Sequence, residues 1–391
     1  MGAETEVIHQ SIQVLDVQYR RTARGIDEIV DVPAAAAAAA TTSVESPAFV
    51  ELDIRASDAI PAISSEPELF VPAIRSGSFA DIGPRRYMED EHIRIDDLSA
   101  HLASLLRCPT PSAFYGVFDG HGGPDAAAYI KRHAIKLLFE DADFPQALQA
   151  DDVFLGEVEN SVRKSYLHAD LALADDCTIN KSSGTTVLTA LVFGRLLLVA
   201  NAGDCRAVLC RKGEVVEMSQ DHRPIYDAER HRVEECGGYI DDGYLNGVLS
   251  VSRALGDWDL KLPQGSTSPL IAEPEFKQTI LTEDDEFLII GCDGIWDVMS
   301  SQQAVSIVRR GLQRHDNPER CARELVMEAL RRNTFDNLTV IVVCFSNEQD
   351  ECSTNQEDGA KQQKAKVNRC SLSTEALCSI SSWLEKCGGG N

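Results

Sequence analysis

The sequence contains no long apolar run and no excess of basic residues. A membrane-spanning helix needs about 18 consecutive apolar residues, and no segment of the chain approaches that length, so we predict no membrane span. The formal net charge is −25, which argues against a nucleic-acid partner because such proteins present a basic face to phosphates. Phosphate chemistry stays possible, because carboxylates can hold metal ions that reverse the local charge.

The cysteines form no recognisable framework. The chain has 12 of them, spread along its length without a C-x-x-C pair, and the first residues, MGAETEVIHQ, lack the basic-then-apolar pattern of a signal peptide. Most of these thiols are therefore expected to be small buried hydrophobic groups in a reducing compartment. We predict an intracellular protein, located in the cytoplasm, the nucleus or both.

Composition divides the chain into three parts. Residues 1–75 include an alanine run at 34–40 and read as a low-complexity extension; residues 76–346 read as one folded domain, and residues 347–391 as a polar tail. Apolar periodicity predicts helices at 124–140, 302–313 and 318–331, and strands at 113–118, 186–193, 196–200, 205–210, 214–218, 287–291 and 338–345.

The order of these elements does not alternate regularly between strand and helix. This order argues against a doubly wound parallel sheet and favours antiparallel strands with helices packed outside them. We predict an α+β fold.

Aspartates follow or precede several of the apolar strands. Asp119, Asp204 and Asp293 come after such runs, and Asp336 comes before one. A carboxylate at a buried strand end is costly unless it is paired or bound to a cation, and oxygen ligands suit Mg²⁺ and Mn²⁺. These positions predict one shared acidic metal site, although each Asp-Gly pair taken alone is equally consistent with a turn.

Together with their neighbours, these residues resemble the ordered motifs of the type 2C serine/threonine protein phosphatases, in particular plant-like members. The resemblance covers residues 76 to 345. The matching segments are Arg85-Arg86-Tyr87-Met88-Glu89-Asp90, Asp119-Gly120-His121-Gly122-Gly123, Ser183-Gly184-Thr185-Thr186, Asn201-Ala202-Gly203-Asp204, Asp221-His222-Arg223-Pro224, Ser252-Arg253-Ala254-Leu255-Gly256-Asp257, Asp293-Gly294-Ile295-Trp296-Asp297 and Asp336-Asn337.

The resemblance implies a sandwich of two antiparallel sheets flanked by helices, with two Mg²⁺ or Mn²⁺ ions per subunit at one edge and a flap formed by residues 221–262. It implies that Asp119 bridges the two metals, that Asp293 and Asp336 complete the first, and that the carbonyl of Gly120 joins the second. The remaining matches are Glu89, acting through water, Asp90 close by, and Asp204 and Asp297, which with Asp293 would hold a weaker third ion.

The same resemblance implies how the reaction proceeds. Arg85, rather than the adjacent Arg86, is expected to clamp the substrate phosphate with its planar guanidinium group. His121 is the candidate general acid for the leaving oxygen. Asp257 is left outside the predicted site, as a residue of the loop around Trp258. The implied protein is a monomer that dephosphorylates phosphoserine and phosphothreonine in other proteins, with no phospho-enzyme intermediate.

Three other interpretations remain to be weighed. Cys205 and Arg211 have the C-x₅-R spacing of cysteine phosphatases, but the residues between them read as a strand without glycine. A catalytically silent protein that binds phosphoproteins should lack metal ligands, yet all of them are present. A metallohydrolase of small phosphoesters shares the expected chemistry and needs a substrate comparison to be distinguished.

Overall fold

The computed structural model describes residues 70–102, 109–139, 144–145, 151–261 and 267–347. Almost all of the predicted extension and tail therefore lie outside the described residues. In the described part of the chain, no helix has the length and apolar character needed to cross a membrane. The first strand begins at Pro72 and the last ends at Asn347, so the ordered domain reaches slightly beyond the predicted limits of 76 and 346.

Two five-stranded antiparallel sheets form the framework. The first has the order β1-β15-β14-β8-β9, with strands Pro72–Asp81, Leu338–Asn347, Asp285–Gly291, Arg206–Arg211 and Glu214–Glu217. The second has the order β13-β7-β6-β3-β2, with strands Glu275–Ile280, Leu196–Ala202, Val187–Phe193, Ser112–Phe118 and Glu91–Ile95.

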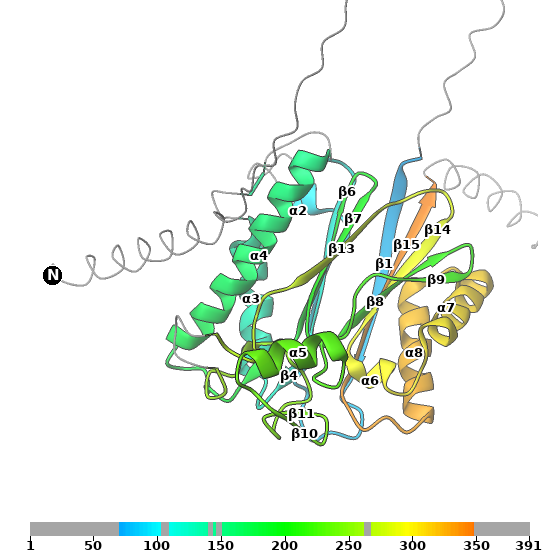
Figure 1. Cartoon of the computed structure of the whole chain (residues 1–391). Helices are drawn as coiled ribbons and strands as arrows, with labels where there is room; N and C mark the ends of the chain where they lie inside the picture. The colour runs from blue at the N-terminus through cyan, green and yellow to red at the C-terminus, as the bar shows by residue number, and fades with distance from the viewer. Residues whose placement is uncertain (1–69, 103–108, 140–143, 146–150, 262–266, 348–391) are drawn as a thin grey trace, which may run out of the picture. The chain divides into compact units, whose positions relative to one another are not determined.

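The sheets stack face to face and helices cover both outer faces (Figure 1). One apolar cluster lies between the sheets and includes Tyr115, Leu197 and Ile341. A second joins α3 (Asp125–Phe139) and α4 (Asp152–Asp175) to the β13–β2 sheet, and a third joins α6 (Asp293–Trp296), α7 (Ser301–His315) and α8 (Pro318–Arg331) to the β1–β9 sheet. Strands β3, β6 and β7 are buried along their whole length because both of their faces are covered. The predicted α+β sandwich is confirmed.

Local sequence explains where several helices begin. In α7 (Ser301–His315), the side chain of Ser300 accepts a hydrogen bond from the backbone N–H of Gln303, and the side chain of Gln303 accepts one from the backbone N–H of Ser300, forming a capping box. In α8 (Pro318–Arg331), Asn317 caps the first turn and proline occupies the first position, where its missing N–H costs nothing. Among the described residues, the other helices outside the flap are α2 (Leu98–Leu102), α3 (Asp125–Phe139), α4 (Asp152–Asp175) and α6 (Asp293–Trp296).

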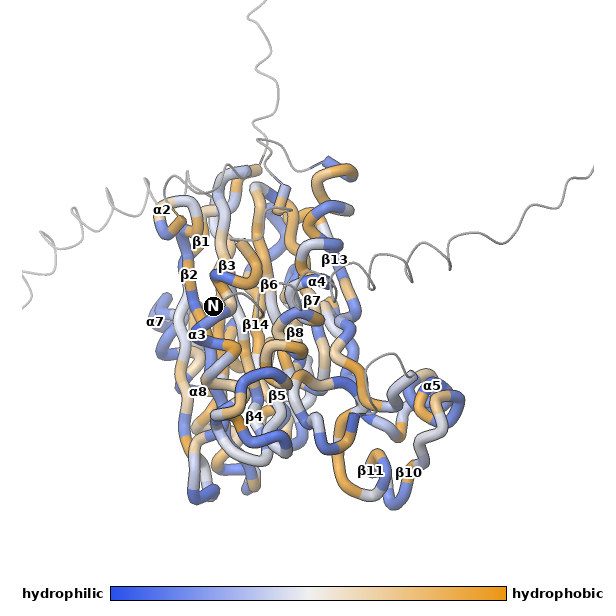
Figure 2. Tube along the Cα trace, turned by 90° about the vertical axis from the view of Figure 1, so that its left-hand side faces the viewer, coloured by the Kyte–Doolittle hydropathy of each residue, from blue (hydrophilic) through white to orange (hydrophobic). Residues whose placement is uncertain are grey.

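The predicted flap contains α5 (Asp227–Glu235) and a short hairpin of β10 (Ile240–Asp241) and β11 (Tyr244–Leu245). It stands out beside the strands at the same end as α6 and β4 (Gly120–His121), as Figures 1 and 2 show. Buried Glu229 anchors it: burial alone would raise the pKa of this carboxyl, but hydrogen bonds from Arg253, Arg232 and Ser252 hold the pKa well below its usual range. Strand β5 (Gly184–Thr185) pairs with β4 on one side and with β12 (Leu255–Gly256) on the other, forming a small three-stranded sheet.

Candidate metal centre

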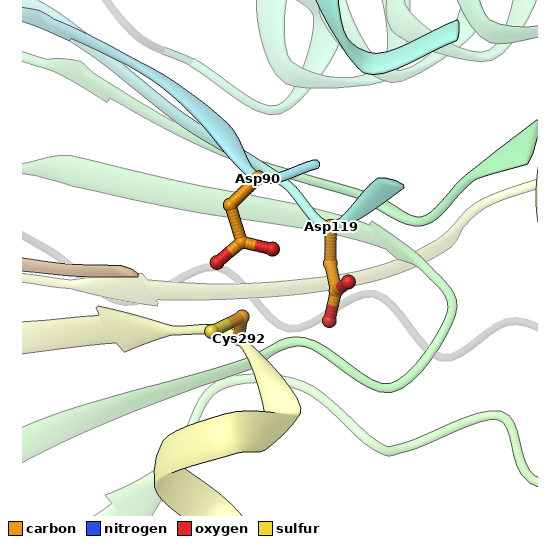
Figure 3. Close-up of side chains that lie close together, drawn as sticks. All are labelled: Asp90, Asp119 and Cys292. Carbon is orange, nitrogen blue, oxygen red and sulfur yellow. The ribbon is translucent and has the colours of Figure 1, made fainter. Parts of the chain in front are cut away.

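Buried acidic residues from both sheets meet at one end of the sandwich. Asp90 directly precedes β2, Asp119 directly follows β3, and Cys292 directly follows β14 of the other sheet. Figure 3 shows the side chains of Asp90 and Asp119 reaching from their loops toward Cys292. One potential ligand atom from each of the three lies within 4.8 Å of the other two. This convergence exists because antiparallel strands of both sheets begin or end at the same edge.

Asp119 also belongs to a second acidic group. Its carboxylate, with those of Asp204 and Asp293, places three oxygens within 4.8 Å of one another. Asp204 follows β7 and Asp293 opens α6, so this group again draws on both sheets. Asp119 is thus the residue common to both groups, which is the position that a carboxylate bridging two ions must occupy.

The protonation behaviour of these carboxyls shows that the site fits a cation. Burial, reinforced by neighbouring carboxylates, raises the pKa of Asp119 and of Asp293 well above the usual range. Burial likewise raises the pKa of Asp90 and of Asp204 to about 6. The Oδ2 atoms of Asp90 and Asp204 are buried without a hydrogen-bond partner among the described residues. Divalent cations would satisfy these oxygens and remove the mutual repulsion.

Arg223 offsets part of this negative charge. Its guanidinium lies 2.7 Å from Asp297, 3.0 Å from Asp204 and 3.5 Å from Asp293. The contact with Asp204 is an ion pair by distance only, because neither atom has hydrogen-bond geometry. Arg223 therefore sits among the three carboxylates expected to hold a weaker third ion, where its charge would oppose a cation.

Close packing holds Glu89 and Gly120 next to the acidic groups. A Cβ atom at position 120 would lie 2.4 Å from the carbonyl oxygen of Glu89, so only glycine fits there. The side chain of Glu89 accepts a hydrogen bond of 2.8 Å from the backbone of Gly123, and its own N–H donates one of 2.8 Å to Asn337. The Asn337 amide also donates to the carbonyls of Ile82 and Tyr87, which fixes the preceding loop.

Asp336 and Arg85 meet at the mouth of the site. Arg85 Nη2 donates a hydrogen bond of 2.5 Å to Asp336 Oδ2, and its Nε donates one of 2.8 Å to the carbonyl of Phe335. Nearly half of the Arg85 side chain is exposed. An accessible guanidinium beside the acidic groups can meet an incoming phosphate.

Asp257 contacts the candidate general acid. His121 Nε2 lies 2.7 Å from Asp257 Oδ2, and the Asp257 side chain is almost fully buried. Asp257 has a left-handed backbone with φ of +53°, which aims its carboxylate across the small β12-β5-β4 sheet. Sequence analysis left this residue outside the site. The signal was present in the motif that ends at Asp257, but nothing in the sequence showed that it faces His121.

Two residues that lie among the acidic groups were not predicted to belong to the site. Arg223 lies within the quoted motif 221–224, and Cys292 directly precedes Asp293 in the sequence. The competing cysteine chemistry finds no support: Cys205 is fully buried and burial raises the pKa of its thiol well above the usual value. Its supposed partner, Arg211, is paired with Asp285 at 2.8 Å.

The raised pKa values predict how metal-free protein responds to pH. When the pKa of a carboxyl is higher in the folded state than in the unfolded state, the group stabilises the fold fully at pH values below its unfolded-state pKa. This stabilisation is lost as the pH rises through its folded-state pKa. For Asp90 and Asp204 that window runs from 3.8 to about 6. In the presence of chelator, we expect the free energy of unfolding to fall across this pH range by on the order of 3 kcal/mol per group. Added Mn²⁺ should restore the lost stability at neutral pH.

Thermal unfolding at a series of pH values, with chelator and with Mn²⁺, measures this effect. Asp204→Asn should flatten the pH dependence in chelator, and Asp125→Asn, at an exposed position on α3, should leave it unchanged. A metal-free protein that becomes more stable from pH 4 to 6, with no change in Asp204→Asn, would contradict the assignment.

Sequence comparison agrees with this geometry. The family model described as "Protein phosphatase 2C" matches residues 75–338. "Probable protein phosphatase 2C 2" of Oryza sativa subsp. japonica is 65% identical, over 98% of this chain and 99% of its own length. "Probable protein phosphatase 2C 13" of Arabidopsis thaliana is 56% identical, over 88% of this chain and 91% of its own length.

Solved structures show the same fold. A serine-threonine phosphatase 2C from Toxoplasma gondii superposes with a TM-score of 0.59 at 24% sequence identity, covering 71% of this chain and 98% of its own. At this identity the likeness concerns the fold alone, while the family match and the plant relatives concern the sequence. The chain belongs to the protein phosphatase 2C family of metal-dependent serine/threonine protein phosphatases.

Proposed function

We propose that this phosphatase hydrolyses phosphoserine and phosphothreonine in proteins by direct attack of a metal-activated water, with no phospho-enzyme intermediate. The observation that carries the proposal is the pair of acidic groups sharing Asp119, in which buried carboxylates repel one another and leave oxygens without partners. Such an arrangement is unfavourable unless cations occupy it. Expected substrates are phosphorylated proteins.

The family resemblance assigns the residues that would hold two Mg²⁺ or Mn²⁺ ions, and the two acidic groups support the part of that set formed by Asp90, Asp119, Asp204 and Asp293. Asp119 would bridge them, Asp293 and Asp336 would serve one, and the Gly120 carbonyl would serve the other, with Glu89 reached through water and Asp90 in support. When bound, such ions lower the pKa of a water and neutralise phosphate charge. Asp204, Asp293 and Asp297 would form a weaker third site, from which Arg223 would have to withdraw.

Polar side chains of the protein would bind the substrate phosphate and donate a proton to the leaving oxygen. Arg85 would leave Asp336 to hold the phosphate oxygens through parallel N–H donors. His121 would carry a proton on Nδ1 for the leaving serine or threonine oxygen, while Asp257 holds Nε2 and fixes the ring. Both assignments rest on proximity to the acidic groups together with the side-chain chemistry.

The test is phosphate release from a phosphothreonine peptide with Mn²⁺ or Mg²⁺, repeated with excess chelator and with a sugar phosphate as the competing substrate. Release that needs metal and prefers the peptide supports the proposal. Equal or faster release from the sugar phosphate would favour a small-phosphoester hydrolase. Absence of release from folded, metal-loaded protein would favour the silent binding protein.

Arg85 offers a sharper prediction, because the neighbouring Arg86 is a matched control. Arg85→Ala should lower kcat/KM for the phosphopeptide between about tenfold and a hundredfold, the equivalent of charge-assisted hydrogen bonds worth about 1.5–3 kcal/mol. Arg85→Lys should recover little of the loss, since an ammonium lacks the planar fork. Steady-state kinetics of both variants and of Arg86→Ala measure this. An equal loss in Arg86→Ala would transfer the role to that residue.

A further inference from the structure

A basic groove lies on the outer surface of α7 and α8, away from the acidic groups. It has a volume of about 1120 Å³ and its lining is rich in arginine. In Figure 2, α7 appears largely hydrophilic. The arginines of the groove are Arg310, Arg314, Arg320, Arg323, Arg331 and Arg332.

The charges within the groove do not cancel. Its lining contains six arginines and two glutamates, Glu324 and Glu328, so four positive charges remain in excess. Glu324 is shared between Arg314 at 2.8 Å and Arg320 at 3.5 Å. Glu328 is likewise shared, between Arg331 and Arg332. This excess stands out in a chain whose net charge is −25.

The guanidinium groups are accessible to a ligand. The side chains of Arg314, Arg320 and Arg331 are 63%, 62% and 72% exposed. Met327, also in the groove, is 43% exposed and adds an apolar contact area. The groove can therefore bind an extended acidic segment along its length.

One end of the groove lies close to the point where the described chain ends. Arg75 on β1 donates a hydrogen bond of 2.8 Å to the carbonyl of Asp316, in the turn between α7 and α8. In the sheet register Arg75 faces Cys344, shortly before the end of β15 at Asn347. The described chain thus ends close to that turn, which Arg314 and Arg320 flank.

We propose that the groove binds the acidic segment 348–358 of the same chain. The segment holds five carboxylates and no basic residue: Glu348, Asp350, Glu351, Glu357 and Asp358. Eleven extended residues reach about 36 Å, whereas the 14 residues of α8 rise only about 21 Å. The segment is long enough to run the whole groove.

Because the segment is covalently joined to the domain, weak ion pairs are enough to keep it bound in the groove. Each exposed ion pair contributes at most about 1 kcal/mol, but a segment joined to the fold by a short connection has an effective concentration in the millimolar range. Several such pairs would therefore keep the segment bound at low salt. Because the pairs are exposed, raising the salt concentration should weaken the contact.

Carbodiimide cross-linking in the full-length chain tests the contact. Carbodiimide joins carboxylates to amines, and the arginine guanidinium does not take part in this reaction. Arg314→Lys and Arg323→Lys therefore each introduce one reactive amine into the groove while keeping its positive charge. Arg132→Lys, at an exposed position on α3, is the matched control. We expect amide links from residues 348–358 to the introduced groove amines, within one chain, at least about tenfold more frequent than to the control amine, and fewer in 0.5 M salt.

Peptide mapping of the monomer and dimer bands separates the outcomes. Links within the monomer from Glu348, Glu357 and Asp358 that become several-fold fewer in Asp350→Lys/Glu351→Lys support the proposal. Links found only between chains would assign the groove to a second copy. Two results would overturn the proposal and assign the groove to an acidic partner protein. The first is that links to the control amine are as frequent as links to the groove amines. The second is that the groove amines react with a free acidic peptide but form no link to residues 348–358.

Discussion

Asp119→Asn is expected to lower the turnover number by about a thousandfold or more. A bridging carboxylate serves both ions, and a metal contributes several kcal/mol to transition-state stabilisation, where each 1.36 kcal/mol is tenfold in rate. An amide oxygen carries no charge and cannot bridge two cations equally well. Phosphate release from the phosphothreonine peptide and Mn²⁺ binding by calorimetry measure the two losses.

The same variant should be more stable than the wild type when metal is absent. Burial and the charges of Asp90, Asp293 and Asp204 raise the pKa of Asp119 in the folded state, so replacing this carboxyl with a neutral group of similar size removes repulsion at neutral pH. Thermal unfolding in chelator should give a higher midpoint for Asp119→Asn than for the wild type or for Asp125→Asn. A variant with wild-type turnover would falsify the two-metal assignment, and a lower midpoint would show that Asp119 has a structural role of its own.

His121→Gln is expected to separate two kinds of substrate. A serine or threonine oxygen is a poor leaving group and needs a proton, so kcat for the phosphothreonine peptide should fall by about 10²–10⁴-fold. p-Nitrophenol leaves readily as its anion, so kcat for p-nitrophenyl phosphate should change far less. Asp257→Asn, which removes the charge of the hydrogen-bond partner of His121 Nε2, should show the same pattern with a loss of about 10- to 100-fold.

The control for this experiment is His133→Gln on α3, whose ring contacts the carbonyl of Tyr129 rather than the acidic groups. It should leave both rates unchanged. If His121→Gln slowed both substrates equally, His121 would act in binding or in holding the loop, and the proton would have to come from another group.

Five of the strands that were predicted correctly share one physical property. Strands β3, β6, β7, β14 and β15 read as continuous apolar runs because sheet or helix covers both of their faces, and their observed limits differ from the predicted ones by about two residues at most. Helices α3, α7 and α8 show clear apolar stripes, and α8 begins at a recognisable signal, Asn317-Pro318.

The elements for which no prediction was made are the more polar ones. Strands β1, β2 and β13 are edge strands whose residues are mostly half-buried or exposed, so no alternation of apolar residues reveals them. Helix α4 is 24 residues long but buries polar side chains. One of them, Asp170, is paired with Lys261 at 2.6 Å, a partner far away in the sequence. Polar residues of this kind acquire their environment only when the chain folds.

By itself the sequence determined the family, the sandwich of antiparallel strands and the carboxylates expected to bind metal, because apolar runs and short ordered motifs are local properties of the chain. Only the tertiary structure decided which charges face one another. It placed Asp119 in both acidic groups, Asp257 against His121, and Arg223 among Asp204, Asp293 and Asp297. These contacts join residues from separate strands and loops, and their energies depend on burial and distance, which no local pattern encodes.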